Sequence, residues 1–292
     1  MNKLRPLLFA AILISFVSCE KEFSTENSGN NDNEFIVGID CRISKIVYID
    51  TAGTAAGGTG TGLGSIESEI NNQDIDTLIN MYDSLSATLE FYRKPVYRND
   101  SIYINSDEYF IVDANKRILK MHGLLDPTDP FSLQFDVFYT YNANGYLVTK
   151  TYYLTITPTT PYLKVDYTYA GAGNLTRMTA VNLPGGDLHM DADLTYYSLT
   201  VPKRYIYIFP DEINYPQFTQ FFNFGSRNFN AVKDIKVRNY DPGNVVRDSL
   251  VSTFSNYRMS NDTYILSVQM GGNNQPSIPA LAGKLKFSYH CR

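Results

Sequence analysis

The chain has 292 residues, with 25 Lys and Arg against 30 Asp and Glu and a net charge of −5 at pH 7. This mildly acidic balance argues against nucleic acid or an anionic lipid surface as a partner. Aromatic residues make up 14% of the chain, as 23 Tyr and 17 Phe with no Trp. Because flat rings pack well on a pleated surface, the composition favours β-strands.

The first 18 residues have the pattern of a secretory signal peptide. Lys3 and Arg5 precede the apolar run Leu7–Val17, which is shorter than the roughly 20 residues that a membrane-spanning helix needs. The segment ends at Phe16-Val17-Ser18-Cys19, which resembles a bacterial lipobox. The resemblance implies that residues 1–18 are removed and that Cys19 carries lipid. The mature chain then has 23 bases, 30 acids and a net charge of −7.

A flexible tether is expected over residues 19–34. Ser24–Asn33 consists largely of Asn, Ser, Gly and acidic residues, which cannot bury enough apolar surface to fold. Cys19–Glu22 resembles the short export signal of surface-exposed lipoproteins in Bacteroidota. That resemblance implies an outer-membrane lipoprotein that faces the cell exterior, with a periplasm-facing orientation as the alternative. Residues 35–292 are then expected to form a single β-rich domain of repeated hairpins.

The two remaining cysteines, Cys41 and Cys291, are an even pair in an exported, disulfide-permissive compartment. By strand alternation, Cys41 shares a face with Ile43, and Cys291 shares a face with Phe287. We predict a disulfide that joins the two ends of the domain, worth at most about 5 kcal/mol. Two buried free thiols are the alternative.

A hairpin signature recurs between residues 78 and 198. In each unit, alternating apolar residues lead to an aromatic residue or Val and then to a short polar turn. The turn starts are Asp83, Asp113, Asn142, Ala170 and Ser198, spaced by 28 to 30 residues. This spacing fits two strands and two connections, so all five turns are expected at the same end of one antiparallel sheet.

Most segments have strand alternation, and one has helical spacing. Leu163–Tyr169 and Lys284–Cys291 alternate apolar with polar residues. Asp74–Leu85 also fits a helical stripe, but the repeat favours a strand there. A short helix is predicted over residues 213–224, where Phe side chains have helical spacing and Gly225 follows. We expect it to cover the open end of the sheet; a ligand platform is the alternative.

These patterns predict an all-β fold. Roughly 12 to 16 strands form a long antiparallel meander of hairpins, which curls into an open or closed barrel-like sheet because twisted open sheets seldom exceed about 10 strands without closing or splitting. Lys164, Lys236 and Lys286 lie on the strand face opposite the apolar residues. A lipid-spanning sheet would accept these cations only in its lumen, so we do not expect an outer-membrane porin.

Parts of the chain resemble a known protein family. The opening Cys41–Ile46, the Tyr-Asp and Tyr-Asn hairpins, and the closing Val268–Gly272 and Phe287–Cys291 are similar to an uncharacterised Bacteroidota outer-membrane lipoprotein family. Its domain is described as β-rich, porin-like and YD-repeat-like. The resemblance spans residues 41–291 and implies that fold and location, but no activity is assigned to the family. The turn Asn144-Gly145-Tyr146 lacks the Gly-Arg pair that follows the turn of typical YD repeats.

Motifs of known chemistry do not occur in the sequence. His122, His189 and His290 lack the spacing of a zinc site or a catalytic triad, and no nucleophile elbow or phosphate-binding glycine loop is present. We therefore assign no catalytic residue, metal or cofactor.

Carboxylates are the remaining chemical candidates, because a glycosidase needs only two of them about 5 to 9 Å apart. Asp126 and Asp129 form one candidate pair, and turn formation explains them more simply. Asp187, Asp191 and Asp193 form the other set, which lacks the glycine of an EF-hand calcium loop.

Three functions fit the sequence. The favoured one is a lipid-anchored, non-catalytic surface module that binds a glycan, peptide or protein through loops and exposed tyrosines. The second is an extracellular polysaccharide hydrolase that uses a carboxylate pair. The third is a structural role in envelope assembly. In each of them the chain meets the membrane through its N-terminal lipid and binds no nucleic acid, while the ligand-binding residues and the oligomeric state stay unassigned.

Overall fold

The computed structural model describes residues 41–50, 62–71, 76–83, 89–125, 132–171, 173–201, 207–210, 221–260, 264–273 and 283–290. They belong to one compact unit, Asp32–Arg292, and form 17 strands in one sheet. The strands are β1 (Arg42–Asp50), β2 (Gly62–Ile70), β3 (Asp76–Asp83), β4 (Leu89–Arg93), β5 (Val96–Tyr97), β6 (Ser101–Tyr103), β7 (Tyr109–Val112), β8 (Ile118–Leu124), β9 (Gln134–Tyr141), β10 (Leu147–Leu154), β11 (Pro161–Tyr169), β12 (Leu175–Asn182), β13 (Leu188–Thr200), β14 (Asn230–Asp241), β15 (Val245–Ser260), β16 (Tyr264–Asn273) and β17 (Gly283–His290). The structure offers no helix, in the part of the chain it describes, with the length and apolarity to cross a membrane.

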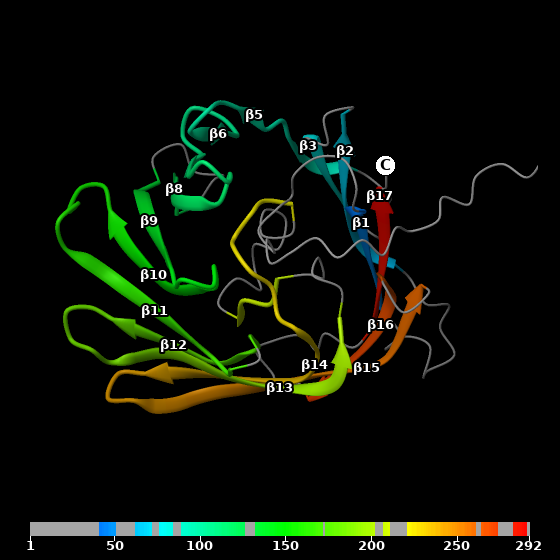
Figure 1. The fold of residues 1–292 in the computed structure, drawn as a ribbon. Helices are drawn as coiled ribbons and strands as arrows, with labels where there is room; N and C mark the ends of the chain where they lie inside the picture. The colour runs from blue at the N-terminus through cyan, green and yellow to red at the C-terminus, as the bar shows by residue number, and fades with distance from the viewer. Residues whose placement is uncertain are drawn as a thin grey trace, which may run out of the picture. The chain divides into compact units, whose positions relative to one another are not determined.

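The sheet is a curled meander of antiparallel strands, which confirms the predicted fold class. Strands that follow one another in the sequence pair with each other. In addition, β17 pairs with β1, so the last strand lies beside the first (Figure 1). Among the described strands, β4 and β5 are the consecutive pair without a ladder. Lys94 and Pro95 separate them, and proline cannot donate to a ladder. The sheet is therefore open at this seam.

The ambiguous segment Asp74–Leu85 contains strand β3, as the repeat favours. The strand count is one above the expected range because Lys94-Pro95 divides one path across the sheet into two short strands. The antiparallel pairings from β1 through β2 and β3 give the direction of β4. The pairings from β1 to β17, and from there back along the meander to β5, give the direction of β5. By these two routes, β4 and β5 run in the same direction.

Two described parts of the connection between β13 and β14 lie on the concave side of the sheet (Figure 1). We call these residues, 207–210 and 221–228, the inner segment. The ring of Phe222 lies 5.1 Å from that of Phe110 on β7, and the ring of Phe224 lies 5.5 Å from that of Tyr139 on β9. The inner segment and the inward-facing strand residues share one continuous apolar core.

The helix predicted over residues 213–224 falls mostly outside the described residues. Its described end, Phe221–Phe224, is not helical: it is a turn and bend followed by a bridge from Asn223 to Arg117. Phe221, Phe222 and Phe224 are each 2% exposed, inside the curled sheet. Helical spacing of a few aromatic residues in a short run did not distinguish a helix from a buried irregular segment.

Hydrogen bonds attach the inner segment to the turn between β9 and β10. Ser226 donates its backbone N–H to the carbonyl oxygen of Gly145 at 2.9 Å and its hydroxyl to that of Asn144 at 2.9 Å. Gly225 has φ of 89°, and a Cβ there would lie 2.2 Å from the carbonyl oxygen of Gly145. Glycine is therefore required at position 225, where the two backbones meet.

Four tyrosines make the same long-range contact. Each lies near the end of an odd-numbered strand and donates its hydroxyl to a backbone carbonyl near the start of the preceding strand, at 2.7 Å. The pairs are Tyr141 to Ile118, Tyr196 to Leu175, Tyr257 to Val232 and Tyr289 to Ile265. We call these contacts the tyrosine bonds. Burial raises the pKa of Tyr141 and of Tyr196 above the ordinary value.

The expected placement of the five turns holds for three hairpins and is wrong for Asp83. Asp113, Asn142 and Ala170 follow β7, β9 and β11, which run in the same direction. Ser198 lies within β13, just before the long connection to β14. Asp83 ends β3, which runs oppositely to β7, so its turn lies at the other end. The 30 residues between Asp83 and Asp113 hold three crossings, because β6 and β7 have only 3 and 4 residues.

Candidate functional site

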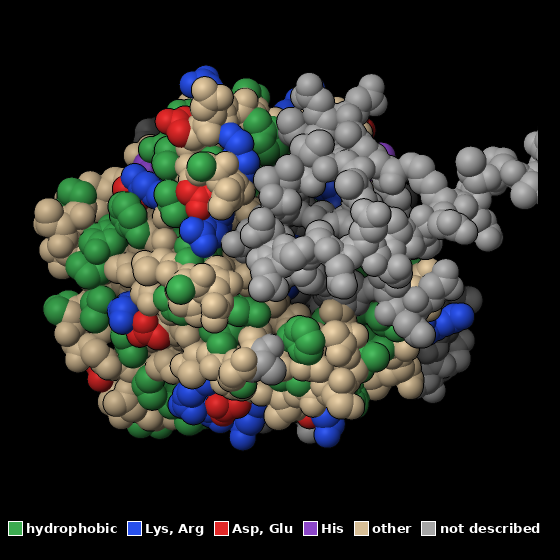
Figure 2. Space-filling view, in the orientation of Figure 1, with side chains coloured by type: hydrophobic (Ala, Val, Ile, Leu, Met, Phe, Trp, Pro, Cys, Tyr) green, Lys and Arg blue, Asp and Glu red, His purple; other side chains and the backbone are tan. Residues whose placement is uncertain are grey.

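Ion pairs lie on the convex side of the sheet, which we call the outer face, and Figure 2 shows Lys, Arg, Asp and Glu side chains along the rim of the molecule. Lys45 pairs with Glu67 at 2.7 Å, and Lys164 with Asp166 at 2.9 Å. The first pair joins the neighbouring strands β1 and β2, and the second joins two residues of β11 that point to the same face.

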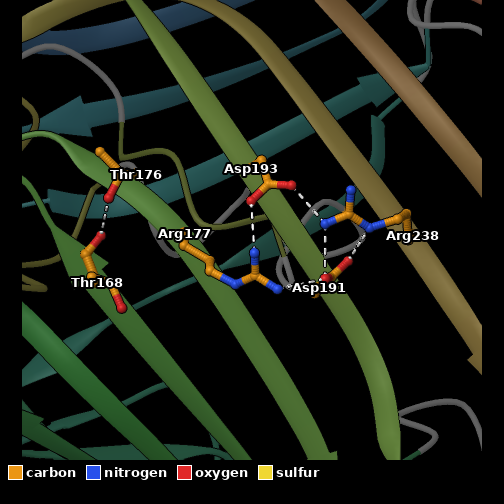
Figure 3. A network of polar contacts seen from close by, with 6 residues as sticks. All are labelled: Thr168, Thr176, Arg177, Asp191, Asp193 and Arg238. Carbon is orange, nitrogen blue, oxygen red and sulfur yellow. Dashed lines mark hydrogen bonds and ion pairs between the residues drawn. The ribbon is translucent and has the colours of Figure 1, made fainter. Parts of the chain in front are cut away.

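The largest group of such charges contains two of the predicted carboxylates, Asp191 and Asp193 (Figure 3). Arg238 on β14 donates from Nε and Nη2 to Asp191 at 2.6 and 2.8 Å, and from Nη2 to Asp193 at 2.6 Å. Arg177 on β12 donates to Asp191 at 3.0 Å and to Asp193 at 3.2 Å. The hydrogen bond to Asp191 raises the pKa of Arg238 above its ordinary value. Two guanidinium groups therefore bracket both carboxylates.

This arrangement fits a structural role for the two carboxylates. The Asp191 side chain is 2% exposed and accepts three hydrogen bonds from two arginines, so burial and these donors keep it from a substrate or a metal ion. In the described part of the chain, no group of three or more His, Cys, Asp or Glu side chains could hold a metal ion.

The other predicted candidates do not converge with this network. Asp187 and His189 are exposed, in and beside the turn between β12 and β13. His290 is the last residue of β17 and is half-buried. Asp126 and Asp129 lie outside the described residues.

The structure reveals a row of side chains on the outer face that the sequence spacing did not indicate. Tyr103, Tyr109, His122, Asp136 and Tyr153 lie directly opposite one another on β6 to β10. We call them the outer aromatic row. The rings of Tyr103 and Tyr109 stack at 5.4 Å, and those of Tyr109 and His122 at 4.8 Å. The members are spaced irregularly along the chain, so only the strand register brings them together.

Polar groups and one exposed ring adjoin the outer aromatic row. His122 Nδ1 lies 2.9 Å from Asp136 Oδ1, and Lys120 Nζ lies 3.0 Å from Asp136 Oδ2. The neighbouring Phe138 is 44% exposed and meets the ring of Tyr153 edge-on at 5.5 Å. An exposed ring beside a carboxylate, an imidazole and an ammonium group offers both apolar contact and hydrogen bonds to a ligand.

Two other polar groups are buried and therefore inaccessible. Asp76 is 1% exposed and pairs with Arg42 and the hydroxyl of Ser68. Burial raises the pKa of Asp76, although the Arg42 charge opposes this shift. Lys150 is fully buried, with its Nζ 5.0 Å from the ring centroid of Phe209.

The predicted disulfide and lipid attachment each involve a residue that the structure does not describe. Cys41 is buried at the start of β1, while Cys19 and Cys291 lie outside the described residues. The ladder between β1 and β17 ends with Arg42 opposite His290.

Comparisons with known proteins identify a shared fold. No family model and no curated protein matches the chain. A porin-like protein from Bacteroides uniformis ATCC 8492 has a TM-score of 0.57 and 12% identity, over 85% of this chain and 96% of that chain. A porin-like protein from Bacteroides vulgatus ATCC 8482 has a TM-score of 0.45 and 12% identity, over 86% and 99% of the two chains. The chain thus has the β-rich fold of the first protein, in agreement with the porin-like resemblance.

Proposed function

We propose that this chain is a lipid-anchored cell-envelope protein whose exported domain binds a ligand on its outer face and conducts no solute through its sheet. The observation that carries the proposal is the polarity of the sheet. Its concave side is packed mainly with apolar side chains, apart from the buried Lys150 and the Arg42–Asp76 pair, and is filled by the inner segment, whereas its convex side carries paired surface charges. Membrane-spanning sheets have the reverse polarity, with an apolar exterior and a polar lumen.

The energetic consequence is large. Each Lys or Arg placed on a lipid-facing strand near the bilayer midplane costs about 2 to 4 kcal/mol. The outer face carries five such cations, Lys45, Lys120, Lys164, Arg177 and Arg238, which at the midplane would together cost about 10 to 20 kcal/mol before any compensation by their carboxylate partners. The similarity to a solved porin-like protein fits an envelope location, and the polarity favours a domain held at the membrane by its anchor.

The anchor is Cys19, at the end of a signal peptide that resembles a lipobox. A lipid chain there and the tether of residues 19–34 would hold the domain at the outer membrane, facing outward according to the Cys19–Glu22 resemblance. The chemistry of the described carboxylates does not favour the hydrolase alternative, because arginines bracket Asp191 and Asp193.

The candidate binding surface is the outer aromatic row with the adjoining Phe138. A flat surface with one exposed ring and several hydrogen-bonding groups suits a glycan or an extended peptide. Binding needs no proton transfer, so it does not require the paired carboxylates that the sheet uses for its own stability.

The proposal is tested with the full protein purified in detergent. Intact-mass analysis should find acyl chains on Cys19, and Cys19→Ala should abolish them, while Ser18→Ala, which keeps a small residue before the lipid acceptor, should retain them. Addition to a planar bilayer should produce no conductance steps. Unacylated mature protein would refute the anchor, and discrete conductance steps would refute the proposal that the filled sheet conducts no solute.

The binding surface is tested separately by a glycan and peptide array screen. A ligand found in this way should bind at least about tenfold more weakly to Phe138→Ser. Val245→Ser is the matched control, since Val245 is 62% exposed at the start of β15, away from the row. Equal losses from the two variants, or no ligand in the screen, would contradict the assignment of this surface.

A further inference from the structure

An exposed apolar and basic patch lies where β13, β14 and β15 reach the end of the sheet at which β1 begins. We call that end the tether end, because residues 19–40 precede β1. Leu199 and Phe229 are 39% and 52% exposed, and Val201, next after β13, donates its N–H to the carbonyl oxygen of Phe229 at 3.0 Å. Tyr197, 37% exposed, extends the patch to β15 by donating to the carbonyl oxygen of Phe254 at 3.0 Å.

Three cations lie toward the same end of the sheet, on β14, β15 and β17. Lys233 is the additional residue of a bulge in β14, between the residues that pair with Thr195 and Tyr196. Arg258 on β15 and Lys286 on β17 lie in one cross-strand row through β16. All three are exposed, and none forms an ion pair with a described carboxylate.

The absence of carboxylate partners distinguishes this patch from the charged network of β12 to β14. There the arginines are neutralised by Asp191 and Asp193. The acid nearest to Lys233 in sequence, Asp234, accepts the hydroxyl of Thr195 at 2.9 Å instead. A chain with a net charge of −5 thus carries uncompensated positive charge beside exposed aromatic side chains.

We infer that this patch, formed by Tyr197, Leu199, Phe229, Lys233, Arg258 and Lys286, docks on the surface of a phospholipid bilayer that contains anionic headgroups. The aromatic and aliphatic side chains would enter the headgroup region, where tyrosine and phenylalanine rings are favoured, and the cations would face the phosphates. The negative net charge of the whole chain does not prevent this, because charges beyond about one Debye length are screened.

The tether makes a weak docking surface effective. This step rests on the proposed anchor at Cys19. Cys41 follows Cys19 by 22 residues, and a flexible chain of that length has a root-mean-square span of about 26 Å. A bilayer held so close acts at an effective concentration in the millimolar range, so even a contact of about millimolar affinity would be populated.

The test uses the full lipidated protein in phosphatidylcholine vesicles, with or without about a quarter phosphatidylglycerol. An amine-reactive reagent labels exposed lysines, and mass spectrometry measures the rate at each one. Labelling of Lys233 and Lys286 should slow at least about threefold when phosphatidylglycerol is present. Lys94, exposed beside the seam, should label at the same rate in both vesicles.

Charge-reversal variants and sedimentation distinguish bilayer docking from loss of the anchor and from self-association. Phosphatidylglycerol should also slow hydrogen exchange at the exposed backbone amides next to these lysines. Lys233→Glu with Lys286→Glu should remove this slowing, whereas Lys233→Arg with Lys286→Arg should keep it. Protein that does not sediment with either vesicle would refute the anchor itself. Protein that sediments with both vesicles but labels equally in both would refute the docking and leave the anchor intact. Slowing that appears without vesicles and grows with protein concentration would show a second copy on the patch and would also refute it.

Discussion

The tyrosine bonds should stabilise the sheet at the ends of four odd-numbered strands. Tyr196→Phe removes only the hydroxyl that donates to the carbonyl of Leu175 at 2.7 Å. Leu175 is 1% exposed, so water cannot replace the donor. Loss of one such hydrogen bond costs about 1 to 2 kcal/mol. The four bonds end on different strands, so the four Phe substitutions together should cost about 4 to 8 kcal/mol.

This cost is measurable because domains of this kind have about 5 to 15 kcal/mol of total stability. Urea unfolding of each variant should show a lower midpoint with an unchanged slope. Tyr153→Phe is the control, since its ring packs edge-on against Phe138 on the outer face. A Tyr196→Phe midpoint that equals that of the control would refute the reasoning.

The same contacts predict a loss of stability in alkali. Burial raises the pKa of Tyr141 and Tyr196 in the folded protein. A group with a raised folded pKa contributes stability that is complete below its unfolded pKa and is lost as pH rises through the window above about 10. Unfolding midpoints should therefore fall above that pH, and the Tyr196→Phe variant should show a shallower fall.

Three further predictions concern single positions. Thiol labelling of denatured, unreduced protein should find neither Cys41 nor Cys291 free, because the two cysteines are the sequence neighbours of Arg42 and His290, the pair that ends the β1–β17 ladder; two labelled thiols would exclude the bond. In urea unfolding, Gly225→Ala should lower the free energy of unfolding by more than about 2 kcal/mol, because φ is 89° and the added Cβ would meet the backbone. Gly171→Ala, which adds a Cβ in open space, should change the free energy of unfolding by less than about 0.5 kcal/mol. Arg238→Lys should cost about 1 to 3 kcal/mol, since lysine cannot bridge two carboxylates with a planar fork; a thermal midpoint equal to that of the wild type would contradict this.

The meander itself could be predicted from the sequence because it depends on local alternation. Leu163–Tyr169 alternates residue by residue, and the structure places Val165 and Tyr167 in the core. The turn at Asn142 was equally local, since its side chain accepts the N–H groups of Asn144 and Tyr146 at 3.0 Å. Such features need no information from distant parts of the chain.

Features that depend on register could not be predicted. His122 meets Asp136 on the neighbouring strand, and their separation of 14 positions in the sequence carries no spacing signal. Likewise, Arg177 and Arg238 reach Asp191 from strands on either side of β13. The position of Asp83 was wrong because equal spacing along the chain does not fix how many short strands lie between two turns.

The inner segment explains why so wide a sheet has an apolar interior. Side chains alone fill a sheet of about eight strands that closes on itself, whereas sheets of about 16 to 18 strands leave a channel. Here the inward-facing residues include Ala180 and Ala192, which leave space on the concave side. The connection between β13 and β14 supplies the missing volume through Phe209, Phe222 and Phe224. Alternation along a strand shows that one face is apolar but not whether that face is enclosed, so the aromatic side chains of this one long connection decide between a packed domain and a pore.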